Sequence, residues 1–165
     1  MAHTLVVIRH AKSDWDAPVG DEERPLAPPG RRQAPETGRW IAEHLDPLDL
    51  AVVSVAIRAW QTWDLVAAEL PAAPPTRLAR GAYTFSGDQL LDVVRHLPEH
   101  AGTVALVGHN PAVEALVDTL TGVWTRMPTS ALAVVAMTEW AAGTGQLRAA
   151  GRPADGVVRL TAPPA

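Results

Sequence analysis

Three short apolar runs, each followed by a helix-patterned segment, constrain the fold of this 165-residue chain more than any other feature. They are TLVVI at 4–8, LAVVSV at 50–55 and TVALVGHN at 103–110. A strand that is apolar at successive positions is buried on both faces, as in a parallel sheet with helices on either side. The runs therefore predict buried strands of a parallel α/β sheet.

The segments between these runs predict helices, and the last third predicts further strands. Helices are expected at 30–45, 58–70, 86–97 and 110–122, with a long loop at 11–29 and an extended piece at 76–82. Ser86 and Asn110 are predicted N-caps, with Pro111 in the first turn and Gly122 beyond the helix end. Strands are expected at 130–140, 145–151 and 156–160. Together they predict one domain, 1–165, with a three-layer α/β/α sandwich fold and a mostly parallel central sheet.

The composition excludes several classes of function. A net charge of −4 provides no general attraction for nucleic acid or an anionic membrane, so any anion site must be local. The absence of cysteine excludes disulfides, thiolate metal sites and cysteine nucleophiles. With no basic, apolar leader and no apolar stretch of 18 residues, we expect a cytoplasmic protein that is not inserted in a membrane.

Polar side chains follow the predicted strands at the edge where a ligand would bind. Arg9 and His10 follow the first strand, Arg58 comes just after the second, and His109 ends the third. Ligands of open parallel sheets bind beyond the carboxyl ends of the strands. One strand-end histidine is usually structural, but two arginines and two histidines at one rim favour a phosphate pocket.

The same residues carry a family resemblance. The stretches VIRHAKSDW, RPLAPPGRRQA, IRAWQT, VGHNP and PTSALAVV occur in this order between residues 5 and 137. The chain resembles the histidine phosphatase superfamily, which has a phosphoglycerate mutase-like fold, and in particular its small branch of SixA-like phosphohistidine phosphatases. An Arg-His pair alone is a weak signal, whereas the pair together with GHNP and RAWQT is specific.

The resemblance implies roles for the residues at the rim. His10 would be the nucleophile, and Arg9, Arg58 and His109 would hold the phosphoryl oxygens, with Asn110 as a further phosphate-binding residue. The resemblance implies no metal and no cofactor. A neutral imidazole is needed for attack, and neighbouring cations favour it by lowering the pKa of His10.

Two features depart from the family pattern or leave a role open. Ser54-Val55 stands where relatives commonly carry Ser-Pro before the second arginine. The general acid has no clear match; Asp88 is the first candidate and Asp14 the second, although an aspartate at a helix start is more often a cap. Trp15, in the loop after His10, is expected to line the substrate mouth with Asp14.

The expected substrate is a protein-borne phosphohistidine. Imidazole has a pKa near 6.5 and leaves with little help from an acid, unlike an alkoxide. A small-molecule phosphomonoesterase with the same mechanism is the first alternative, and a phosphate-binding module without turnover is the second. A mutase is less favoured, because so short a chain has little sequence to enclose its site.

Other signals favour structural interpretations. HLPEH at 96–100 matches a zinc peptidase pattern, but Pro98 indicates that the helix ends within it. His3 and His44 are expected on the surface. The tryptophans other than Trp15 are expected in the core.

Overall fold

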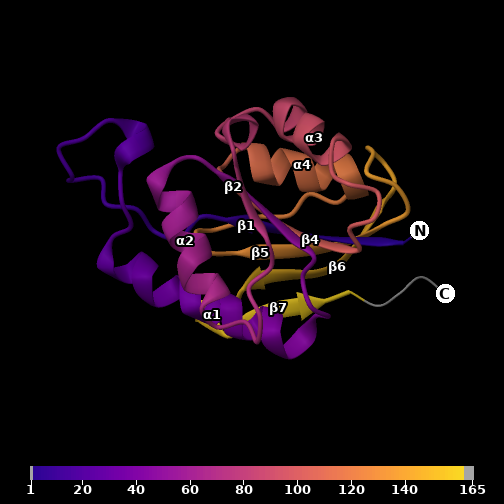
Figure 1. Cartoon of the computed structure of the whole chain (residues 1–165), viewed down its shortest axis with the longest axis horizontal. Helices are drawn as coiled ribbons and strands as arrows, with labels where there is room; N and C mark the ends of the chain where they lie inside the picture. Colours follow the sequence, from indigo (N-terminus) through magenta and orange to yellow (C-terminus); the bar gives the residue numbers. More distant parts are fainter. Residues whose placement is uncertain (1, 162–165) are drawn as a thin grey trace.

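The computed structural model describes residues 2–161, which form a seven-stranded mixed sheet between two pairs of helices (Figure 1). The elements in chain order are β1 (His3–Arg9), η1 (Asp21–Glu23), α1 (Pro28–His44), β2 (Leu50–Ser54), α2 (Ile57–Ala67), β3 (Thr76–Ala79), η2 (Arg80–Ala82), α3 (Gly87–Arg95), β4 (Thr103–Gly108), α4 (Ala112–Thr121), β5 (Leu132–Met137), β6 (Gly145–Arg152), η3 (Pro153–Asp155) and β7 (Val157–Leu160). Each predicted helix and strand is present, with ends shifted by a few residues.

The strand order is β3-β2-β4-β1-β5-β6-β7. Strands β3, β2, β4 and β1 pair in parallel. β5 pairs antiparallel with β1, β6 with β5, and β7 with β6. The predicted α/β sandwich fold is thus confirmed, with an antiparallel half to the sheet. Within residues 2–161, no helix is long and apolar enough to cross a membrane.

The apolar runs alternate between the two faces of the sheet, which explains their unbroken hydrophobicity. Leu5 and Val7 point to the core beneath α3 and α4, whereas Val6 and Ile8 point to the core beneath α1 and α2. All four side chains are fully buried. Because side chains alternate along a strand, a strand covered on both faces has no position left for a polar residue.

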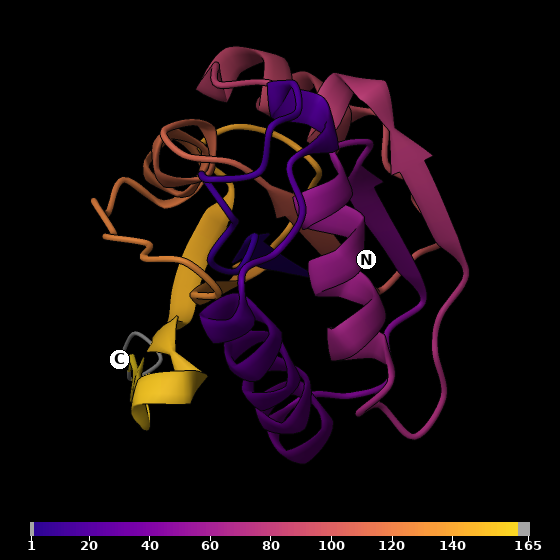
Figure 2. The ribbon, with the colours of Figure 1, turned by 90° about the vertical axis from the view of Figure 1, so that its left-hand side faces the viewer.

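The parallel register brings the ends of β1 and β4 together. Ile8 lies opposite Val107 and Arg9 opposite Gly108, and the His10 amide donates to the Gly108 carbonyl at 3.1 Å. Figure 2 looks onto this carboxyl edge, where the segment after β1 passes in front of the strand ends.

Several local predictions need correction. His3 is buried, with 3% of its surface exposed, because its ring stacks on Trp140 at the amino end of the sheet. Trp124, expected in the core, is 66% exposed. The N-cap residue of α4 is Pro111 rather than Asn110. The Asn110 side chain instead donates to the Met127 carbonyl oxygen. Ser86 caps α3 as predicted, accepting from the Gln89 amide, and α3 ends at Arg95, before Pro98.

Candidate active site

Four predicted residues converge on one cleft of about 200 Å³ at the carboxyl ends of β1, β2 and β4. The cleft is lined by Arg9, His10, Lys12, Ser13, Trp15, Asp21, Arg24, Arg58, Phe85, His109, Asn110 and Thr129. Four of these side chains are cationic and one is a carboxylate, in a chain whose net charge is −4. The acidic chain therefore concentrates positive charge at this edge of the sheet, as an anion site requires.

The hydrogen bonds of His10 fix its tautomer. Its Nδ1 lies 2.8 Å from the Ala11 carbonyl oxygen, which can only accept, so Nδ1 carries the proton. The lone pair of the ring is therefore on Nε2, where the Nε–H of Arg58 donates to it at 3.3 Å. A neutral imidazole with its Nε2 lone pair in a cationic cleft is chemically a nucleophile.

The environment keeps His10 neutral. The ring is 7% exposed, and burial lowers the pKa of His10 well below its usual value of 6.5, with His109 and the nearby arginines acting in the same direction. Burial and Arg58 lower the pKa of His109 to about 3. The two rings lie 5.0 Å apart between centroids, and both are neutral at physiological pH.

The segment after His10 is held in place by neighbouring elements. The Ala11 amide donates to Thr62 Oγ1 of α2 at 2.9 Å, and the Lys12 amide donates to Gln33 Oε1 of α1 at 3.1 Å. Gly30 allows α1 to approach, because a Cβ at that position would lie 2.1 Å from the Lys12 carbonyl oxygen. These contacts hold the backbone that follows His10 in a fixed position.

Arg58 is the most completely buried charged residue of the cleft, with 1% of its surface exposed. Besides His10, it donates through Nη1 to the Asp21 carbonyl oxygen at 2.6 Å and through Nη2 to Asp21 Oδ2 at 3.0 Å. A buried guanidinium is stable only when its charge is paired, and Asp21 provides that partner.

Asp21 is a site residue that the sequence interpretation missed. Its Oδ2 also accepts from the Tyr83 hydroxyl at 2.5 Å, and its Oδ1 accepts from Arg24 Nη2 at 3.1 Å. Burial alone would raise the pKa of Asp21, but the hydrogen bonds from Tyr83 and Arg58 outweigh it and the pKa is lowered. Asp21 is thus an ionised acceptor. The available signal was the pair Asp21 and Arg24, three residues apart, with Arg24 as the first residue of RPLAPPG.

Several polar atoms of the cleft are buried without a hydrogen-bond partner among residues 2–161. They include Arg9 Nε, Arg24 Nε and His109 Nδ1. Buried donors are nearly always satisfied, and an incoming oxyanion would satisfy the two unpaired guanidinium N–H groups of the cleft that also holds His10. Arg9 is fixed by a hydrogen bond from Nη1 to the Met127 carbonyl oxygen at 3.1 Å.

Ser54 and Asn110 position the second histidine and its neighbourhood. His109 Nε2 lies 2.7 Å from Ser54 Oγ, which also accepts from the Ala56 amide at 3.2 Å. The Ser54 hydroxyl therefore contacts His109 with Val55, rather than proline, as the next residue. Asn110 lines the cleft as expected, but its amide donates to Glu114 and to the Met127 carbonyl oxygen. The atom left without a partner is Oδ1, which accepts hydrogen bonds. The Asn110 side chain is therefore better suited to connecting Glu114 and Met127 than to binding phosphate oxygens.

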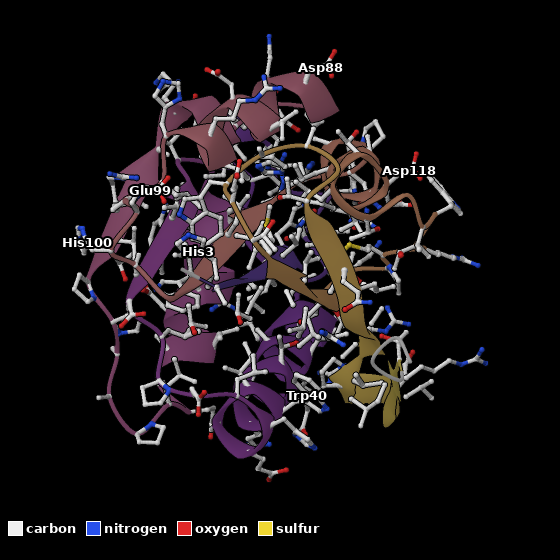
Figure 3. The ribbon with its side chains drawn as sticks, turned by 90° about the vertical axis from the view of Figure 1, so that its right-hand side faces the viewer. His3, Trp40, Asp88, Glu99, His100 and Asp118 are labelled. Atoms are coloured by element: carbon white, nitrogen blue, oxygen red, sulfur yellow. The ribbon has the colours of Figure 1, made fainter. Side chains whose placement is uncertain are left out.

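The two candidate acids lie elsewhere. Asp88 is exposed in the first turn of α3 and lines a separate hollow with Tyr83 and Asp92. Figure 3 shows it projecting away from the body of the protein. Asp14 Oδ1 accepts from the Asp16 amide within its own turn, at 2.9 Å. Of the predicted mouth residues, Trp15 lines the cleft, where the Arg24 guanidinium lies 3.6 Å from its ring centroid.

The HLPEH stretch, which matches a zinc peptidase pattern, forms no cluster of candidate metal ligands within residues 2–161. Over residues 2–161, no group of three or more His, Asp or Glu side chains is placed to hold a metal ion. His96 and Glu99 of the HLPEH stretch have other contacts: His96 Nδ1 bonds the Asp92 carbonyl oxygen, and Glu99 faces His3.

The chain is similar to proteins of known sequence and structure. A Mycobacterium tuberculosis protein of uncharacterised function is 32% identical over 116 residues, or 70% of this chain and 71% of the relative. A SixA structure from Nakamurella multipartitia has a TM-score of 0.82 at 29% identity, covering 93% of this chain and 97% of that one. The protein histidine phosphatase SixA complexed with tungstate also has a TM-score of 0.82, at 23% identity, covering 93% and 99%.

The family model of the histidine phosphatase superfamily (branch 1) matches residues 5–80, which include Arg9, His10, Asp21, Arg24 and Arg58. The SixA structures cover 93% of this chain, so the similarity of fold extends beyond residue 80. The chain belongs to the histidine phosphatase superfamily, branch 1.

Proposed function

We propose that the protein is a phosphatase that removes the phosphoryl group from phosphohistidine in proteins, through a covalent intermediate on His10. The observation that carries the proposal is the Nε2 lone pair of His10 in a cleft with buried, unpaired arginine donors. Family membership and the SixA-like fold support it. The SixA protein of the same fold was solved with tungstate, a tetrahedral oxyanion like phosphate.

In the proposed first step, His10 Nε2 attacks phosphorus and forms an N–P bond while the bond to the leaving imidazole breaks. The leaving ring takes its proton from solvent, and the phosphorylated His10 becomes a cation whose Nδ1–H remains bonded to the Ala11 carbonyl oxygen. Arg58 exchanges its contact with Nε2 for a phosphoryl oxygen. Arg9, Arg24 and His109 stabilise the negative charge on the other oxygens.

In the second step, water attacks phosphorus, the N–P bond to His10 breaks, and inorganic phosphate leaves with the neutral histidine restored. The cationic side chains provide the charge stabilisation that a metal provides in other phosphatases. We therefore expect turnover in the presence of a chelator.

The ionised state of Asp21 supports a P–N substrate. A carboxylate whose pKa is lowered does not donate a proton to an alkoxide near neutral pH. Imidazole, with a pKa near 6.5, leaves as the protonated ring with little help. The same cleft therefore suits phosphohistidine better than a sugar phosphate.

The test is a comparison of kcat/KM for a phosphohistidine peptide with a panel of sugar and nucleotide phosphates, with chelator present. We expect the phosphohistidine peptide to exceed the panel by about 100-fold, a typical effect of an acid that alkyl esters need and imidazole does not. Faster turnover of one member of the panel would favour the small-molecule phosphomonoesterase. Phosphate binding without product release would indicate a binding module.

A further inference from the structure

Two aromatic residues cluster beside His109, although the chain is poor in them. The sequence contains one Tyr and one Phe, at positions 83 and 85. Their ring centroids lie 5.5 Å and 5.9 Å from that of His109, and both rings meet it edge-on. Tyr83 is engaged by Asp21 through its hydroxyl, whereas Phe85 lines the cleft with 54% of its surface exposed. Phe85 is thus an apolar ring left facing solvent at the phosphate cleft.

A second exposed ring borders the same cleft. Trp15 is 72% exposed, and the Arg24 guanidinium 3.6 Å from its centroid holds it by a cation–π contact. Single exposed apolar side chains are common and need no explanation. Two large rings at one small cationic cleft are a different observation, because each leaves a flat apolar surface next to donors suited to a phosphoryl group.

The geometry of phosphoryl transfer places the leaving group near these rings. The nucleophile and the leaving group lie on opposite sides of phosphorus in an in-line displacement. His10 is 7% exposed and therefore lies deep in the cleft, so the leaving group points toward the open mouth. Among the lining residues, Trp15 and Phe85 are large apolar side chains with more than half of their surface exposed.

We infer that Phe85 and Trp15 form an aromatic subsite that holds the flat ring of the leaving group, the imidazole of phosphohistidine. Planar rings pack against aromatic side chains by offset stacking or edge-to-face contacts, which an aliphatic leaving group cannot make. This inference rests on the proposed function and adds a basis for selecting the substrate: the P–N bond is cleaved by His10, and the ring is selected by the mouth.

The experiment compares two substrates with the same bond. A phosphohistidine peptide and phosphoramidate both present a P–N bond, but phosphoramidate has no ring. The ratio of their kcat/KM values is measured for the wild type, Phe85→Leu and Trp15→Leu, since leucine keeps an apolar side chain and removes the flat ring. Trp124→Leu is the matched control, because Trp124 is also exposed, at 66%, and does not line the cleft.

We expect the ratio to fall about fivefold in Phe85→Leu and in Trp15→Leu, as for the loss of one aromatic contact, and to stay unchanged in Trp124→Leu. p-Nitrophenyl phosphate is the third probe, with its kcat/KM measured in the same variants. A fall of similar size in Phe85→Leu and Trp15→Leu would show that the subsite accepts any flat ring, and an unchanged kcat/KM would show that it is specific for imidazole. Unchanged ratios in both cleft variants would overturn the inference and leave the proposed function intact. A wild type that turns over phosphoramidate but not the phosphohistidine peptide would overturn both.

Discussion

Strand β1 begins with a buried histidine, His3, and is directly followed by another, His10, and the two have opposite surroundings. His3 donates through Nδ1 to the Ala101 carbonyl oxygen at 2.9 Å and stacks on Trp140. Its Nε2 lies 3.6 Å from Glu99 (Figure 3). His10 also bonds a carbonyl oxygen through Nδ1, but its Nε2 faces arginines and an open cleft. Burial alone therefore does not mark a catalytic histidine; the partner of the second nitrogen does.

The first way to break this comparison is to replace each histidine by asparagine. His10→Asn should lower kcat/KM by roughly 10⁴-fold or more, because it removes the attacking atom. His3→Asn should leave kcat/KM within about twofold but lower the free energy of unfolding by about 1–3 kcal/mol, through loss of the buried ring contact with Trp140. Steady-state kinetics and urea unfolding of both variants measure this; a large loss of activity in His3→Asn would contradict the contrast.

The second prediction concerns the arginine that faces His10. Arg58→Lys keeps the positive charge but loses the forked donors, and kcat/KM should fall by about 10²–10³-fold. Arg80→Lys is the control, because Arg80 is exposed and pairs with Glu22 at 3.1 Å. Initial rates with a phosphohistidine peptide decide the matter. An Arg58→Lys protein within tenfold of wild type would show that Arg58 only balances the charge of Asp21.

The third prediction uses the pKa of His109, which is about 3 in the folded protein and near 6.5 in the unfolded chain. Below pH 6.5 the unfolded chain gains a proton that the folded protein does not take up, so stability falls as the pH decreases toward 3. Between pH 7 and pH 5, wild type should lose about 2 kcal/mol more stability than His109→Gln. His10 is present in both proteins and cancels. Urea unfolding at the two pH values that gave equal losses would contradict the neutral, buried state of His109.

The smallest effect is expected at Asp21. Asp21→Asn should change kcat/KM for the phosphohistidine peptide by less than about tenfold, because the ionised Asp21 holds Arg58 and Tyr83 rather than donating a proton. Loss of a general acid would instead cost about 100-fold or more. Glu22→Gln, the neighbouring change at the salt bridge with Arg80, is the control. A 100-fold loss in Asp21→Asn alone would make Asp21 the acid.

The sequence predicted the parts of the site that follow strand ends. Arg9, His10 and His109 lie where the apolar runs stop, and parallel pairing brings such positions together wherever the helices cover the sheet. Arg58 was predicted in the same way, one residue into α2. Periodicity and strand ends are local features of the sequence, and the positions of these four residues in the site depend on little else.

The residues that sequence reasoning missed come from the loop at 11–29 and from contacts between distant segments. Asp21 reaches Arg58 only because the loop folds back across the edge of the sheet, and no periodicity predicts that path. Asp88 was placed wrongly for the same reason. Its helix is set by Gly87, where a Cβ would lie 2.6 Å from that of Ala115, and this packing of α3 on α4 leaves Asp88 exposed.

The central claim is that Nε2 of His10 carries the phosphoryl group during turnover. The most direct test mixes the protein with a phosphohistidine peptide, quenches it within one turnover in alkaline denaturant, and measures the intact mass of wild type and His10→Ala, with chelator present. The account predicts a transient addition of one phosphoryl group to wild type only, with turnover lost in the variant. Turnover that survives in His10→Ala, or a phosphoryl group on another residue, would contradict it.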